Sequence, residues 1–153
     1  ATMAPNPIST RWGCWYDAVN YHVQNLDFYP QFIAQEMELA SQPPISVKEL
    51  FAVTENPETW TSLCVQMNFV SDNCARFMKL NDSFQSRKPC ALSAWNTLNS
   101  LEREVEAHQL LTIEDCPCLS TGMLSADEKS TLLVLFKSAF QYSADKLHKY
   151  MTP

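Results

Sequence analysis

The strongest helix signal in the chain lies in residues 56–80, which read NPETWTSLCVQMNFVSDNCARFMKL. Asn56 is a preferred N-cap residue, Pro57 suits a first helical position, and Glu58 complements the positive end of the helix dipole. Apolar side chains then recur at alternating steps of three and four, at Trp60, Leu63, Met67, Val70, Cys74 and Phe77. These side chains share one helical face, so we predict an amphipathic helix that ends near Leu80, followed by a polar loop over residues 81–88.

The same periodicity recurs in three other segments. The apolar faces consist of Trp15, Val19, His22, Leu26 and Tyr29 in the first segment, of Ala91, Ala94, Leu98, Leu101, Val105 and His108 in the third, and of Leu133, Phe136, Phe140, Ala144, Leu147 and Met151 in the last. Pro30 is expected to end or kink the first helix, because proline lacks an N–H group. Ser125 and Glu128 form a capping box at the start of the last helix. Residues 1–11 are expected to form a loose N-terminal arm.

Four amphipathic helices predict an all-α fold, since a four-helix bundle buries all four apolar faces. The 153 residues fit one helical domain, residues 1–153, and contain only two glycines, which disfavours a fold rich in β-turns. The second and third helices are joined by a short loop and are therefore expected to be antiparallel neighbours. The longer first and third connections permit an up-up-down-down order.

The six cysteines favour that order and predict a disulfide-stapled bundle. They are Cys14, Cys64, Cys74, Cys90, Cys116 and Cys118. An up-up-down-down order places four of them at one end and two at the other, whereas an up-down-up-down order leaves an odd number at each end. We therefore expect a Cys74–Cys90 bond, with Cys14 and Cys64 paired to Cys116 and Cys118 in either order. Cys64 and Cys74 cannot pair, because ten residues of helix separate them by about 15 Å.

Composition indicates a secreted protein. An even number of cysteines together with the glycosylation sequon at Asn81 favours an oxidising, extracellular location. The net charge of −6 argues against binding to nucleic acid or to anionic membranes. No apolar run approaches the roughly 18 residues of a membrane span.

No catalytic or metal-binding signature is present. His22, His108 and His148 accompany no nucleophile motif, and two glycines cannot form a phosphate-binding loop. Cys116-Pro117-Cys118 has no second cysteine pair at zinc-site spacing. We therefore expect a protein that is not an enzyme and that needs no cofactor or metal.

Partner-binding residues are expected on the outward faces of the first and last helices. Tyr16 and Phe28 do not fit the apolar face of the first helix, which predicts exposed aromatic side chains of the kind that dominate interfaces. On the last helix, Lys137, Gln141 and Lys149 lie opposite the predicted core face.

The chain resembles the helical cytokines, specifically the interleukin-6 and interleukin-12 α-chain group. The resemblance is carried by residues 132–140, LLVLFKSAF, followed by Leu147 and Met151, by the C-x₉-C spacing of Cys64 and Cys74, and by Phe28-Tyr29-Pro30. It implies an up-up-down-down bundle whose last helix faces a receptor. In the group, the first cysteine of the C-x₉-C pair precedes its helix, whereas here Asn56-Pro57 places Cys64 inside the helix.

These observations together predict a secreted ligand that binds an extracellular protein receptor. Such a ligand serves signalling or, in a pathogen or parasite, engages receptors of the host. The alternative is a secreted carrier that holds a small apolar molecule between its helices. Its cavity would be lined by Met67, Met78, Met123, Met151, Phe69 and Phe77.

Overall fold

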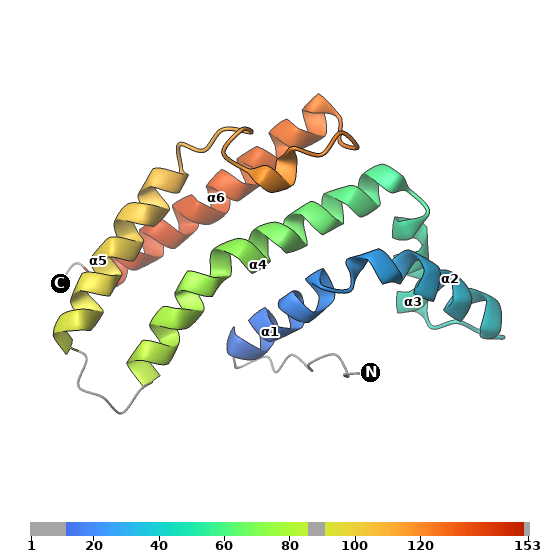
Figure 1. Cartoon of the computed structure of the whole chain (residues 1–153), viewed down its shortest axis with the longest axis horizontal. Coiled ribbons are helices and arrows are strands. Elements are labelled where there is room, and N and C mark those ends of the chain that lie inside the picture. The colour runs from blue at the N-terminus through green and yellow to red at the C-terminus, as the bar shows by residue number, and fades with distance from the viewer. Residues whose placement is uncertain (1–11, 86–90, 152–153) are drawn as a thin grey trace. The chain divides into compact units, whose positions relative to one another are not determined.

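The computed structural model describes residues 12–85 and 91–151, and within these ranges it contains helices and no strand (Figure 1). The elements are α1 (Trp12–Val23), the 3₁₀ turn η1 (Leu26–Phe28), α2 (Tyr29–Leu39), α3 (Ile45–Thr54), α4 (Pro57–Gln85), α5 (Ala91–His108), the 3₁₀ turn η2 (Pro117–Leu119) and α6 (Ala126–Met151). The predicted all-α class is confirmed. The predicted N-terminal arm lies outside the described residues.

The chain divides into two compact units. The first contains the residues up to Ser71 together with Gly122–Leu124, and the second contains Asp72–Thr121 and the residues from Ser125 onward. Helix α4 belongs to both, since its residues up to Ser71 lie in the first unit and the rest lie in the second. The single helical domain over residues 1–153 stays a prediction.

In the first unit, hydrogen bonds join α1 to α4. The Tyr16 hydroxyl donates to the backbone carbonyl of Ser71 at 3.3 Å, and the Ser71 hydroxyl donates to Oδ1 of Asn20 at 2.6 Å. Helix α2 packs against α3, and Ile33 is the buried residue of α2. The other buried apolar side chains described in this unit are Ala18, Leu26, Val65, Phe69 and Leu124.

The first predicted helix breaks earlier than expected. Helix α1 ends at Val23, where the Asn25 side-chain amide donates to the backbone carbonyl of Tyr21 at 2.7 Å and so satisfies a carbonyl at the helix end. Pro30 lies in the first turn of α2, where a backbone N–H would have no acceptor within the helix, so proline costs no helical hydrogen bond there. Trp15, predicted to lie in the core, is 51% exposed. The predicted apolar face assumed one straight helix, which the break at Gln24 and Asn25 does not allow.

Helix α4 begins as the sequence indicates and ends later. Oδ1 of Asn56 accepts a hydrogen bond from the backbone N–H of Thr59 at 3.1 Å, which confirms the N-cap. The helix runs on to Gln85, so the expected polar loop over residues 81–88 begins as helix instead. Polar composition alone does not end a helix, and no glycine or proline occurs between Asn81 and Pro89.

In the second unit, α5 and α6 lie side by side and run antiparallel (Figure 1). The His108 and Phe140 rings lie 4.8 Å apart between centroids, and His148 Nδ1 lies 3.6 Å from a carboxylate oxygen of Glu102. Residue numbers in these contacts therefore fall along α5 as they rise along α6, which makes the two helices antiparallel. Ser125 caps α6, because its hydroxyl accepts from the backbone N–H of Glu128 at 3.2 Å. The buried side chains of this helix pair are Ala94, Leu101, Val105, Leu132, Phe136, Phe140 and Ala144.

This antiparallel pair differs from the up-up-down-down expectation, in which the last two helices run parallel. The connection between them is long enough for either direction, so loop length did not decide whether the two helices run parallel or antiparallel.

No disulfide joins the five described cysteines, Cys14, Cys64, Cys74, Cys116 and Cys118, in this structure. Cys90 and the expected Cys74–Cys90 bond lie outside the described residues. The expected pairing of the cysteines was based on the up-up-down-down order, which this helix pair does not follow. A Cys64–Cys74 bond remains excluded, because its exclusion does not depend on that order.

That exclusion is the first testable prediction. Cys64 and Cys74 both lie inside α4, where ten residues of helix separate them by about 15 Å, beyond the reach of a disulfide. Peptide mapping of the unreduced protein should find no Cys64–Cys74 peptide. Detection of that peptide would show that α4 does not run through both cysteines.

A second prediction concerns the core of the α5–α6 pair. Phe140 is 3% exposed and its ring packs against His108, so Phe140→Ala should leave a cavity and lower the free energy of unfolding by about 3–5 kcal/mol. Urea unfolding followed by circular dichroism measures this change. Tyr142→Ala, on the exposed side of the same helix, is the control and should change it by less than about 0.5 kcal/mol. Equal effects of the two substitutions would contradict the assigned orientation of α6.

Candidate binding surface

The exposed side of α6 carries large apolar side chains beside lysines. Leu135 is 49% exposed and Tyr142 is 64% exposed, and the Lys146 ammonium lies 5.1 Å from the centroid of the Tyr142 ring. A step of seven residues from Leu135 to Tyr142 and one of four to Lys146 keep these side chains within about 40° of one another around the helix. We call Leu135, Tyr142 and Lys146 the α6 surface.

This surface has the composition of a protein-binding site. An aromatic ring supplies a large contact area with few rotatable bonds, and a lysine above it adds a cation–π contact and a positive charge. The charge also favours encounter with an acidic partner. Val134, which is 64% exposed, extends the apolar area along the side of the same helix.

The three residues predicted on this helix differ in how far they are exposed. Gln141 and Lys149 are exposed, whereas Lys137 is half-buried. The Gln141 amide donates to Oδ1 of Asp145 at 2.8 Å, a link between successive turns of the helix. Sequence periodicity predicted an outward position for both lysines, of which only Lys149 is exposed, and it did not single out Leu135 and Tyr142. Their position on the polar face of an amphipathic helix is the signal that would have found them.

The two aromatic residues predicted on the first helix also differ. Phe28 is 68% exposed, as expected, although it lies in the turn η1 rather than in α1. Tyr16 is half-buried, and its hydroxyl is bonded to the backbone of α4. The expectation of an exposed Tyr16 is therefore wrong, because a residue off the predicted apolar face of α1 contacts the neighbouring helix α4.

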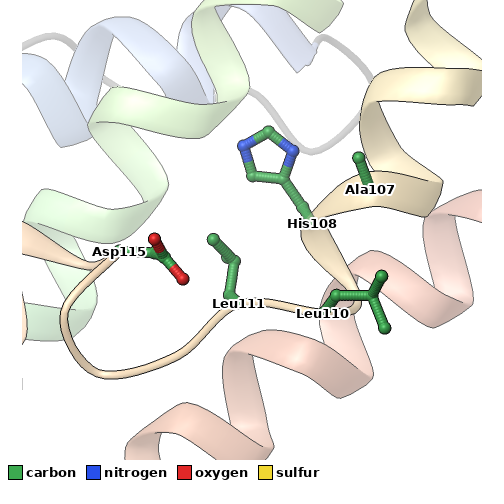
Figure 2. A pocket seen from close by; sticks show the side chains of 5 residues that line it. All are labelled: Ala107, His108, Leu110, Leu111 and Asp115. Carbon is green, nitrogen blue, oxygen red and sulfur yellow. The ribbon is translucent and has the colours of Figure 1, made fainter.

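A shallow hollow lies at the C-terminal end of α5 and in the following loop (Figure 2). It is lined by Ala107, His108, Leu110, Leu111 and Asp115. His108 Nδ1 lies 2.6 Å from the carbonyl of Glu104, and Asp115 accepts hydrogen bonds from the Thr112 N–H at 2.9 Å and hydroxyl at 2.8 Å. The Thr112 hydrogen bonds lower the pKa of Asp115. Both polar groups are thus engaged in local structure, and the hollow offers no acid–base pair arranged around a substrate.

Burial disfavours the thiolate form of four of the five described cysteines. Burial raises the pKa of Cys64, Cys74, Cys116 and Cys118, and the nearby carboxylate of Asp27 adds to the shift at Cys64. A raised pKa keeps a thiol protonated and therefore poorly nucleophilic. Among the described residues, no group of three or more His, Cys, Asp or Glu side chains is placed to hold a metal ion.

Asn81, the predicted glycosylation site, lies in the last turns of α4. It is half-buried, and its side-chain oxygen accepts a hydrogen bond from the Gln85 amide at 3.1 Å. The sequon is therefore helical rather than part of the expected loop, because α4 continues to Gln85.

Comparison of the chain with protein-family models, with curated proteins and with solved structures finds no match. None of the helices in the described residues combines the length and the apolar character that crossing a membrane requires.

The raised thiol pKa values generate a third prediction. In the reduced protein at pH 8, Cys64, Cys74, Cys116 and Cys118 should react with iodoacetamide more slowly than the same cysteines do in denaturant. The native rates should rise with pH as thiolate forms. This rise should come at a higher pH than in denaturant, because a raised pKa shifts deprotonation to higher pH. Mass spectrometry of alkylated peptides over a pH series measures both effects. A native thiol among these four that reacts as fast as its unfolded counterpart would contradict the burial described.

Proposed function

We propose that this chain is a secreted helical ligand that binds an extracellular protein receptor, in the manner of a cytokine. The observation that carries the proposal is the α6 surface, where Leu135, Tyr142 and Lys146 are displayed on one side of a helix whose other side is buried. Helix faces of this kind present rigid anchors, because the buried side holds the helix in place.

Two further features support an extracellular role. The cysteine number is even, and a sequon is present at Asn81. The proposal accordingly includes oxidation of the six cysteines in pairs, glycosylation at Asn81 and closure of the helices into a four-helix bundle. A pathogen or parasite that engages host receptors is one source of such a ligand.

The fourth prediction tests the α6 surface. The labelled full-length chain is screened against a panel of cell-surface receptor ectodomains, and the affinity for the receptor found is measured for two variants. Tyr142→Ala should weaken binding by about tenfold or more, because it removes the largest exposed anchor of the surface. Lys146→Glu should also weaken binding, and its effect should shrink at high salt.

Matched controls lie on α5 of the same unit. Trp95→Ala removes an aromatic side chain that is about as exposed as Tyr142, and Arg103→Glu makes the same charge change as Lys146→Glu. Both controls should bind within about twofold of the unaltered chain. Equal losses from the variants and the controls would show that α6 is not the binding surface. Binding to no receptor of the panel would favour the apolar-ligand carrier instead.

A further inference from the structure

Helix α2 and the last residue of the preceding turn η1 carry a row of exposed apolar side chains in the first unit. Phe28, Phe32 and Leu39 are 68%, 53% and 82% exposed. Successive steps of four and seven residues keep them within about 40° of one line along the helix. We call these three residues the α2 stripe.

The opposite side of α2 determines which way the stripe faces. Ile33 is buried, Met37 is half-buried, and α2 packs against α3. A helix that buries one side against a neighbour holds its other side away from that neighbour. The stripe is therefore a displayed surface of the α2–α3 pair, and three large exposed apolar side chains in one row are typical of an interaction site.

The charge around the stripe is strongly one-sided. Residues 26–39, which span η1 and α2, contain three carboxylates, Asp27, Glu36 and Glu38, and no basic residue. All three carboxylate side chains are exposed. Glu36 lies within the stripe, four residues after Phe32. Within the described part of the chain, none of these carboxylates has an ion-pair partner. Their field is thus uncompensated by neighbouring charges of the segment.

We propose that the α2 stripe binds a basic amphipathic helix of a partner protein. The apolar side chains of such a helix would cover Phe28, Phe32 and Leu39, and its Lys or Arg residues would pair with the carboxylates of the same segment, Glu36 first among them. A second copy of this chain would bring carboxylates against carboxylates, and an anionic membrane would be repelled in the same way. This site is independent of the proposed receptor-binding role of α6, which displays lysine beside its aromatic ring.

The test uses the full chain and a fluorescent synthetic helical peptide of leucine and lysine, with the same peptide carrying glutamate in place of lysine as its counterpart. Fluorescence anisotropy should show binding of the lysine peptide, weakening as salt is added, and no binding of the glutamate peptide. The double variant Phe32→Ser, Leu39→Ser should weaken binding by about tenfold or more at unchanged net charge. Glu36→Lys should weaken it as well, because it reverses the charge within the stripe.

Two controls separate this site from general attraction of a basic peptide to an acidic protein. Leu50→Ser removes an exposed apolar side chain of α3 outside the stripe, and Asp17→Lys makes the same charge reversal on α1. Both should bind the lysine peptide within about twofold of the unaltered chain. Equal losses from the controls and the stripe variants, or equal binding of both peptides, would overturn the proposal. So would dimerisation of the unaltered chain that the double variant abolishes in sedimentation velocity, since a second copy would then be the occupant.

Discussion

Burial of one side of α6 against α5 is the interaction on which the second unit depends. Phe136 and Phe140 are almost fully buried, and they supply the large apolar area that stabilises a helix pair in water. The contacts of Phe140 with His108 and of His148 with Glu102 set the register and the antiparallel direction. Once that side of α6 is buried, the opposite side must face outward. The exposure of Leu135 and Tyr142 is therefore a consequence of packing, and the proposed receptor-binding surface follows from the same contact that stabilises the unit.

The two units display apolar residues in opposite electrostatic settings. On α6, Tyr142 lies under a lysine, so that the surface favours an acidic or π-rich partner. On η1 and α2, the α2 stripe shares its segment with three carboxylates and no basic residue, and the partner proposed for it is basic. Apolar side chains of this size are costly to leave in water, and charges of one sign select what covers them. The two proposals together assign two different partners to the chain, one for each surface.

Local signals in the sequence predicted most of the helices, whereas tertiary contacts determined the details of the candidate sites. Asn56 and Ser125 start their helices as predicted, because capping depends on neighbouring backbone groups alone. The exposure of Trp15 and the partial burial of Tyr16 could not be read from periodicity, since they depend on where α1 ends and on its hydrogen bonds to α4. The direction of α6 relative to α5 was equally undetermined, because a long connection allows both. Loop polarity misled at Asn81, because polar side chains are compatible with a helix and α4 runs on to Gln85.

The antiparallel contact of α5 with α6 is tested most directly by nuclear Overhauser effects between assigned side chains of the two helices. We expect contacts between the rings of His108 and Phe140 together with contacts between the side chains of Glu102 and His148, so that positions fall along α5 as they rise along α6. Contacts in which the residue numbers rise along α5 and along α6 in the same direction would contradict the antiparallel arrangement. The buried side of α6, and with it the exposed surface of Leu135, Tyr142 and Lys146, would then have to be assigned again.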